Sequence, residues 1–153
     1  MKKVVAEFVI RKMQLGDIPF VLKIEQASFT SPWTEETYEH EIKNNIYAHY
    51  FVVETDDKII GYVGIWLVED DAQITNIAII PEFRGYKIGE KLFGFAMQFV
   101  VQHGAKRLSL EVRVSNLTAQ KLYRKFGLVP GAIRKGYYPD DGEDALVMWV
   151  DLA

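Results

Sequence analysis

The sequence predicts an α+β domain in which a mixed, mostly antiparallel seven-stranded sheet is flanked by four helices, in the order βααβββαβαββ. Three observations predict this fold. Three strand-like runs between residues 48 and 80 are joined by short turns, which indicates an antiparallel meander. From Ile88 the apolar residues recur at intervals of three and four, which indicates a helix. Helical runs then alternate with strand-like runs, so at least one pair of strands must be parallel.

Length and composition favour one domain. The 153 residues are 49% hydrophobic, enough to close a core without disulfides or metals, and no linker or repeat divides them, so we expect a single domain over residues 1–153. Cysteine is absent, which excludes a thiolate nucleophile, and the histidines show no metal-ligand spacing, so no metal is expected. No apolar run approaches the roughly 18 residues of a membrane span, which predicts a soluble, cytoplasmic protein. The net charge of −3 disfavours direct binding of nucleic acid.

The first half of the chain predicts one strand, two helices and three further strands. The run AEFVIRKM reads as a strand, and Asp17 then opens a run with helical spacing. Thr34 is a suitable N-cap for a second helix, because acidic residues follow it in the first turn. β-Branched and aromatic residues predict the next three strands. These elements lie within residues 6–13, 18–29, 31–45, 48–55, 58–68 and 72–80.

The second half predicts a long helix, a strand, a short helix and a final hairpin. The long helix begins at Ile88 and ends at Gly104, and residues 106–114 alternate as a strand. Ser115 or Asn116 caps the short helix, which Gly127 ends. The hairpin pairs residues 132–138 with residues 143–152 around a Pro-Asp-Asp-Gly turn.

The stretch IIPEFRGYKIGEKLF, residues 79–93, places two glycines and two basic residues between a strand and a helix. Such a turn binds phosphate, because the first amide groups of the helix are unpaired and Arg84 and Lys87 add positive charge. The stretch lacks the Ser or Thr of a Walker motif and the G-x-G-x-x-G fingerprint, which disfavours nucleoside triphosphates and NAD. Spacing alone fits equally well a tight connection in which Gly85 and Gly89 only turn the chain.

A carboxylate and a phenol stand out in LSLEVRVSNLTAQKLYRKFGL, residues 108–128. Alternation places Glu111 on the face of the strand opposite its apolar residues, and helical spacing points Tyr123 inward. Taken alone, Glu111 fits an ordinary solvated carboxylate and Tyr123 an ordinary core aromatic.

The stretch NIAIIPEFRGYKIGEKL resembles the pyrophosphate-binding motif Q/R-x-x-G-x-G/A of the GNAT superfamily of acyl-CoA-dependent N-acetyltransferases. Arg84 and Gly89 match its first and last positions, whereas Lys87 stands at its middle glycine. The spacing Glu-x-x-x-x-Asn followed by Leu-Tyr and Phe-Gly resembles the RimI family, the ribosomal-protein-alanine N-acetyltransferases. The stretches SFTSPWTEE and GYYPDDGEDALVMW resemble the same family, so the likeness covers nearly the whole chain and implies the GNAT acyltransferase fold.

The resemblance implies acetyl-CoA as co-substrate, Glu111 as general base and Tyr123 as general acid. It also implies oxyanion donors from a bulged fourth strand around residues 76–78, and pairing of that strand with the pantetheine arm. Lys87 can still offer its backbone amide, provided that its position does not require a positive φ. The cofactor contacts that the resemblance implies are Ile77, Ala78, Ile79, Arg84, Gly85, Tyr86, Lys87, Ile88, Gly89, Glu90, Asn116 and Tyr123. A plain helix cap is an equally good reading of Asn116.

The resemblance places Trp33, Tyr137 and Tyr138 around an acceptor peptide, most simply the N-terminal alanine of a small-subunit ribosomal protein. Rigid rings suit an extended peptide, although the same rings could form a lid over the core. Acidic residues near both segments would attract a cationic peptide, although such runs are also common on solvated faces. Because the chain has no cysteine, we expect direct transfer to the amine, with no covalent enzyme intermediate. Two alternatives stay open: acetylation of a small-molecule amine, and a non-catalytic acyl-CoA-binding module.

Overall fold

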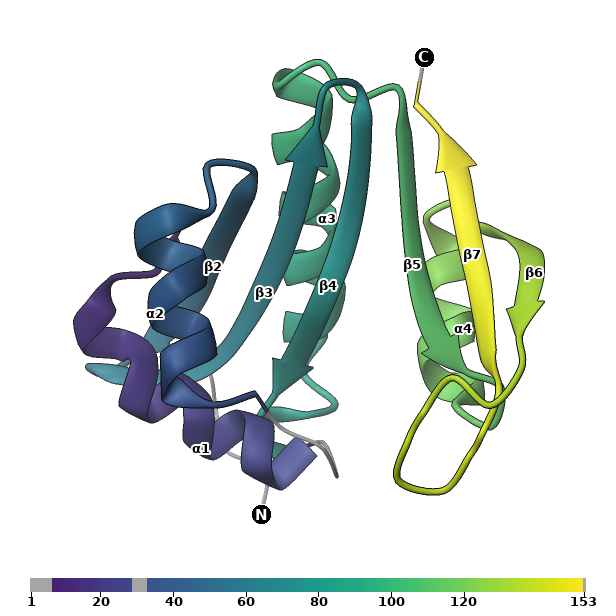
Figure 1. Cartoon of the computed structure of the whole chain (residues 1–153). Coiled ribbons are helices and arrows are strands. Elements are labelled where there is room, and N and C mark those ends of the chain that lie inside the picture. Colours follow the sequence, from purple (N-terminus) through teal and green to yellow (C-terminus); the bar gives the residue numbers. More distant parts are fainter. Residues whose placement is uncertain (1–6, 29–32, 153) are drawn as a thin grey trace.

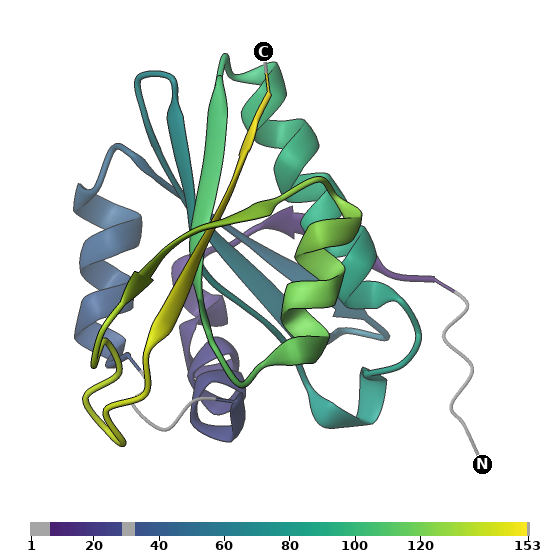
Figure 2. The same ribbon diagram turned by 90° about the vertical axis from the view of Figure 1, so that its right-hand side faces the viewer.

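A computed structural model describes residues 7–28 and 33–152 of the chain (Figure 1). Over these residues, seven strands form one sheet in the order β1-β2-β3-β4-β5-β7-β6, accompanied by four α-helices and two short 3₁₀ helices. The helices α1 and α2 lie on one side of the sheet, and α3 and α4 lie on the other (Figure 2). The elements are β1 (Val9–Lys12), η1 (Leu15–Asp17), α1 (Ile18–Ser28), α2 (Glu35–Asn44), β2 (Ala48–Thr55), β3 (Lys58–Val68), β4 (Asp71–Ile79), η2 (Pro81–Phe83), α3 (Ile88–Gln102), β5 (Arg107–Arg113), α4 (Leu117–Lys125), β6 (Val129–Arg134) and β7 (Ala145–Asp151).

The expected order of strands and helices is confirmed. Thr34 and Asn116 are also confirmed as N-caps that act through their side chains. The Thr34 hydroxyl accepts a hydrogen bond from the amide of Thr37 at 3.2 Å, and the Asn116 carbonyl oxygen accepts one from the amide of Ala119 at 3.1 Å. Gly104 has a φ of 88° just beyond the end of α3, as a glycine C-cap requires. The expected helical position of Phe29 lies outside the described residues.

The expected first strand of the final hairpin was wrong in its bounds. β6 covers Val129–Arg134 instead of residues 132–138, so Tyr137 and Tyr138 lie in the loop that leads to β7. The strand ends here because Gly136 takes a φ of 61° and its amide donates to the Asp144 carboxylate at 2.9 Å, which turns the chain away from the ladder.

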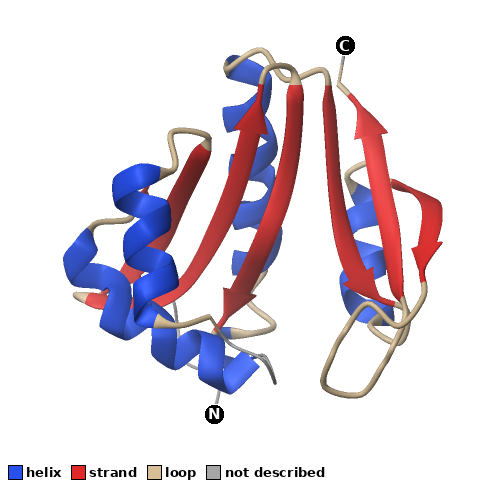
Figure 3. Cartoon of the chain, viewed as in Figure 1, coloured by secondary structure: helices blue, strands red, loops and turns tan. Residues whose placement is uncertain are grey.

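The sheet opens between the neighbouring strands β4 and β5. β1 to β4 pair antiparallel, as do β5, β7 and β6, whereas β4 and β5 are parallel and pair only over Asp71–Gln73 against Arg107–Ser109. Beyond that point β4 and β5 diverge, which Figures 1 and 3 show as two halves of the sheet spreading apart. Among the described residues, therefore, no strand pairs with the second half of β4 on that edge.

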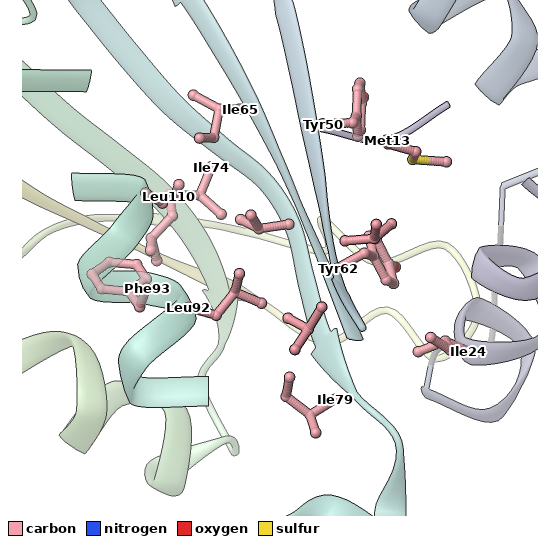
Figure 4. Packing of buried hydrophobic residues seen from close by; sticks show 14 of the residues in the cluster. Met13, Ile24, Tyr50, Tyr62, Ile65, Ile74, Ile79, Leu92, Phe93 and Leu110 are labelled. Carbon is pink, nitrogen blue, oxygen red and sulfur yellow. The ribbon is translucent and has the colours of Figure 1, made fainter. Parts of the chain in front are cut away.

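The core lies on both faces of the sheet. β3 is buried from Ile59 to Ile65 because α1 covers one face and α3 the other, which explains its continuous apolar run. Figure 4 shows Leu92 and Phe93 of α3 packed on one side, with Tyr50 and Tyr62 on the other. Within residues 7–28 and 33–152, no helix has the length and apolar character needed to span a bilayer.

Candidate active site

A cavity of about 540 Å³ lies where β4 and β5 diverge. It brings together Glu111 from β5 and Tyr123 from α4, the two residues expected to carry acid–base chemistry. Four other expected site residues also line it: Ile77, Asn116, Tyr137 and Tyr138. Its wall further includes Glu25 of α1 and Ile74, Thr75 and Asn76 of β4. Of these four, only Asn76 was expected at the site, as a backbone donor.

Glu111 is held in place by three side chains. Alternation along β5 turns it to the face that carries Ser109 and Arg113, and its side chain is only 15% exposed. The Gln73 amide donates to it at 3.3 Å, the Tyr137 hydroxyl donates at 3.1 Å, and the Arg134 Nε lies 3.6 Å from its Oε1. These contacts fix the direction of the carboxylate while leaving it beside the cavity.

Sequence reasoning missed Gln73 and Arg134 as partners of Glu111. Gln73 meets it because β4 and β5 are parallel and pair Gln73 with Ser109, two residues before Glu111 on the same face. Arg134 arrives from the other side, where β7 lies between β5 and β6. No local pattern states which strands become neighbours, so neither contact had a signal in the sequence.

Tyr123 is a buried phenol at the edge of the cavity. It is 7% exposed and packs against Phe93, with ring centroids 5.0 Å apart. Burial, and to a lesser extent the neighbouring Tyr138, raises the pKa of Tyr123 to about 12. Its hydroxyl therefore remains protonated at neutral pH and can serve as a proton donor.

The β4 wall of the cavity contains the expected bulge, one residue earlier than expected. Gly64 pairs with Asn76 and Ile65 with Ile74, which leaves Thr75 as the extra residue instead of a position within residues 76–78. The strand bulges here because Gly64 has no side chain: an added Cβ would lie 2.5 Å from both the Thr75 Oγ1 and the Asn76 Oδ1.

The edge of β4 beyond the bulge is available to a ligand. The Ile80 amide donates to Ile60 on the β3 side, so alternation directs the backbone groups of Ile79 and Ile77 to the edge where β5 has diverged. The Arg84 Nε donates to the Ile79 carbonyl at 2.9 Å, which ties the glycine turn to this edge. Ile77 and Ala78 are half-buried, as walls of a channel for an extended arm would be.

Residues 84–90 follow η2 and include the first turn of α3, which begins at Ile88 (Figure 1). Gly85 has a φ of 88°, which explains a glycine there. Gly89 lies in the first turn of α3, and an added Cβ would meet only the Ile79 Cγ1 at 3.8 Å, an ordinary contact. The protein itself therefore does not require glycine at 89, whereas a ligand that approaches the backbone would. Ala78, Ile79 and residues 84–90 do not line the cavity of Glu111 and Tyr123.

Position 87 does require a positive φ, contrary to the condition under which lysine would replace the motif glycine without strain. Lys87 adopts the left-handed conformation, with φ 63° and ψ 18°, immediately before α3 begins. This is the conformation that glycine adopts without strain, which accounts for a glycine at this place in the motif. Lys87 thus keeps the shape of the turn at a cost in backbone strain.

The loop between β6 and β7 is fixed by Arg113. Its guanidinium contacts Asp140, Asp141 and Glu143 at 3.0 to 3.1 Å and lies 4.0 Å from the centre of the Tyr138 ring. Tyr138 and Tyr137 then pack edge to face, with centroids 5.1 Å apart. Three of the acidic residues expected to attract a cationic peptide are thereby already paired with a cation.

Trp33 lies apart from the two tyrosines. It does not line the cavity; its ring is half-buried and packs against Tyr38 and Tyr50, with centroids 5.1 and 6.3 Å away. Its backbone amide donates to Glu25 at 3.1 Å.

Among the residues that the structure describes, no group of three or more His, Cys, Asp or Glu could hold a metal ion.

These features match a known family. The model of the Acetyltransferase (GNAT) family matches residues 18–128, which is well over half of the chain, and the chain belongs to this family.

The relatives and solved structures agree with this assignment. The ribosomal protein bS18-alanine N-acetyltransferase of Escherichia coli (strain K12) is 30% identical over 94% of this chain and 97% of its own length. A protein of Bacillus subtilis (strain 168) is 59% identical over 94% of this chain and 95% of its own length, and its name gives it the same activity provisionally. The crystal structure of the ribosomal-protein-S18-alanine N-acetyltransferase from Escherichia coli superposes with a TM-score of 0.88 at 30% identity, covering 96% of this chain and 95% of that one.

Proposed function

We propose that this protein transfers the acetyl group of acetyl-CoA to the N-terminal amine of a protein, with the alanine of ribosomal protein bS18 as its acceptor, in the cytoplasm where ribosomal proteins are made. The observation that carries the chemistry is that Glu111 and Tyr123 face one cavity beside the bulge of β4. The names of the relatives support the acceptor.

The residues around the cavity fit the donor. The turn of residues 84–90 offers the free amides of the α3 N-terminus, with Arg84 and Lys87 close by, for a diphosphate. The open edge of β4, with the backbone groups of Ile77 and Ile79, suits an extended pantetheine arm. Acetyl-CoA supplies an activated thioester; the chain supplies position, donors and proton transfer.

Glu111 acts on the acceptor amine. An α-amino group has a pKa near 8, against about 10.4 for a lysine side chain, so modest help from a carboxylate is enough to deprotonate it at neutral pH. Glu111 lies at the cavity with its direction fixed by Gln73 and Tyr137, and takes the proton directly or through water. Tyr137 lies in the loop between β6 and β7, and in this proposal it contacts the bound peptide as well as Glu111.

Tyr123 acts on the leaving group. In this proposal, backbone amides at the Thr75 bulge stabilise the developing oxyanion, and the protonated phenol of Tyr123 gives its proton to the departing thiolate; the bulge and the phenol both border the cavity, which supports these roles. Direct transfer within one complex follows, because the chain has no cysteine to carry the acetyl group.

Two conservative substitutions test these roles. Glu111→Gln and Tyr123→Phe each keep the shape of the side chain, so we expect turnover to fall by roughly 10²–10⁴ while acetyl-CoA affinity changes by less than about twofold. The assay measures acetyl transfer to an alanine-initiated peptide with the bS18 sequence, and calorimetry measures cofactor affinity.

A panel of small amines assayed in parallel separates the proposed acceptor from a small-molecule one. Faster turnover of a polyamine or aminoglycoside than of the peptide would reject the peptide acceptor. A parent protein that binds acetyl-CoA but acetylates none of these acceptors would reject the enzyme in favour of a silent binding module.

A further inference from the structure

A buried carboxylate outside the expected acid–base pair connects the backbone at Trp33 to the wall of the cavity. Glu25 of α1 is 2% exposed and lines the cavity. Its Oε1 accepts hydrogen bonds from the Tyr38 hydroxyl at 2.6 Å, from the Asn76 amide at 2.8 Å and from the Tyr62 hydroxyl. Its Oε2 accepts the backbone amide of Trp33 at 3.1 Å.

These four donors come from four different places in the fold. Trp33 lies two residues before the start of α2, Tyr38 belongs to α2, Tyr62 to β3 and Asn76 to β4. Asn76 directly follows the bulge at Thr75 and also donates to the Tyr38 hydroxyl at 2.9 Å. One carboxylate therefore connects the backbone at Trp33 to the strand that lines the cavity.

The four contacts together use both carboxylate oxygens of Glu25. Two phenols, an amide and a backbone N–H are all donors, so both oxygens must accept. Burial, followed by the Glu25 carboxylate itself, raises the pKa of Tyr38, which keeps the phenol protonated and donating. A buried carboxylate costs free energy unless such donors satisfy it, and among the described residues that contact Glu25 none is a cation.

Glu25 is poorly placed to accept a proton from an amine, because three donors already occupy its Oε1 and almost none of its surface is exposed. Its effect must pass through the groups that it holds. We propose that Glu25 is a positioning residue for acetyl transfer, which holds the backbone at Trp33 and the β4 wall at Asn76 in the positions that acceptor and thioester require. This inference rests on the proposed function, because it assigns Glu25 a part in that same reaction.

The chain contains a matched control for this idea. Glu41 of α2 is 6% exposed and accepts hydrogen bonds from the Tyr50 hydroxyl at 2.9 Å, the Trp66 indole at 2.7 Å and the Asn45 amide at 2.7 Å. It resembles Glu25 in burial and donors, but it does not line the cavity. A purely structural role for buried carboxylates would make the two residues equivalent.

The test compares Glu25→Gln with Glu41→Gln. A glutamine at 25 has one accepting oxygen, so its amide group must face either the Trp33 amide or the cluster of Tyr38, Tyr62 and Asn76, and one side of the connection is lost. We expect Glu25→Gln to lower kcat/KM for the acceptor peptide by about 10- to 100-fold, because small displacements of reacting groups have effects of that size. Its acetyl-CoA affinity should stay within about twofold, and Glu41→Gln should keep at least about a third of the parent kcat/KM.

The proposal would be overturned if kcat/KM fell equally in the two variants, in step with the fall in their melting temperatures. An unchanged kcat/KM in a folded Glu25→Gln protein would also overturn it. If Glu25→Gln does not fold, Tyr38→Phe replaces it, since it removes one donor to Glu25 and the acceptor of Asn76 while keeping the ring. Tyr38→Phe should then lower kcat/KM at least about fivefold, and parent-like kinetics would overturn the proposal.

A readout without turnover separates this inference from the proposed function. Amide hydrogen exchange at Trp33 and at residues 75–77 should accelerate in Glu25→Gln and not in Glu41→Gln, whichever acceptor the protein uses. Unchanged exchange at both places would overturn the connection. If the parent protein acetylates no acceptor but exchange still accelerates in Glu25→Gln, the proposed reaction is rejected and the connection through Glu25 is supported.

Discussion

Among single residues, Lys87 has a strained backbone conformation next to the candidate phosphate site. A left-handed backbone costs an ordinary L-residue roughly 1 kcal/mol relative to glycine, because its Cβ crowds the neighbouring carbonyl. Lys87 takes this conformation next to the unpaired amides of α3. Under the proposed function, the strain would be offset by a positive charge at the N-terminus of α3, where the diphosphate of acetyl-CoA would bind.

Replacing Lys87 separates these two effects. We expect Lys87→Gly to raise the free energy of unfolding by about 0.5–1 kcal/mol, since the strain disappears, and to weaken coenzyme A binding several-fold, since a cation is lost. Urea unfolding and calorimetry measure the two quantities. Lys91→Gly is the control: it lies within α3, where glycine should destabilise by about 1 kcal/mol. A Lys87→Gly protein less stable than the parent would contradict the account of strain.

The raised pKa of Tyr123 gives a prediction about pH. A proton donor works only while protonated, so raising the pKa from 10 to about 12 moves the loss of this donor upward in pH. Between pH 7 and 10 we therefore expect kcat/KM to rise as the acceptor amine, with a pKa near 8, loses its proton, and then to stay level. Initial rates across this range measure the profile. A fall with a midpoint below pH 10 that Tyr123→Phe abolishes would show that the phenol is not held protonated as described.

What the sequence predicts at this scale depends on whether the signal is local. The side of β5 that Glu111 occupies follows from alternation, and the inward direction of Tyr123 follows from helical spacing, so both could be anticipated. Gln73 and Tyr137 reach Glu111, and Asn76 reaches Glu25, from 26 to 51 residues away in the chain. Their meeting depends on tertiary packing, which periodicity does not describe.

At the level of elements, the start of α3 can be tested through its second residue. Gly89 has room for a Cβ in the protein, so Gly89→Ala should raise the free energy of unfolding by about 0.5 kcal/mol through helix propensity. The same methyl group would stand between the backbone amides and a diphosphate, so coenzyme A affinity should fall by about tenfold or more. Chemical unfolding and calorimetry give both numbers.

The control for Gly89 lies five residues further along the same helix. Gly94→Ala gains helix propensity too, with its Cβ 3.4 Å from the Phe126 ring, but it is remote from the turn. It should leave coenzyme A affinity unchanged. If Gly89→Ala binds coenzyme A as tightly as Gly94→Ala does, the phosphate is not held at this helix end.

The final hairpin shows why element boundaries were harder to predict than elements. Its Tyr-Tyr pair has strong strand propensity, yet both residues lie in a loop. The loop is set by Asp144 on the Gly136 amide and by Arg113 of β5, which binds Asp140 and Asp141. Arg113 acts from another strand, so its influence on residues 137–141 had no trace in their own sequence.

For the molecule as a whole, the order of elements was predictable, but the point at which the sheet opens was not. Alternating strand and helix patterns require a parallel pair somewhere after β4. How many residues pair, Asp71–Gln73 with Arg107–Ser109 in the structure, is a property of how two sheet halves twist on their helices. The opening creates the cavity, so the site itself is a consequence of global geometry.

The opening also makes stability depend on the ligand. In the part of the chain that the structure describes, no strand pairs with one edge of β4 beyond Gln73. A coenzyme A arm lying there would complete the hydrogen bonding of β4 while its diphosphate engages α3. At a coenzyme A concentration 100 times its dissociation constant, we expect about 2.7 kcal/mol of stabilisation, or roughly 5–11 °C in the melting temperature of a domain of this size. Amide exchange at Ile77 and Ile79 should slow as well, beyond the global effect. Gly89→Ala should show a smaller shift at the same concentration, because it binds less ligand. A melting temperature that does not move with coenzyme A, or protection that spares β4 altogether, would show that the cofactor does not lie along this edge.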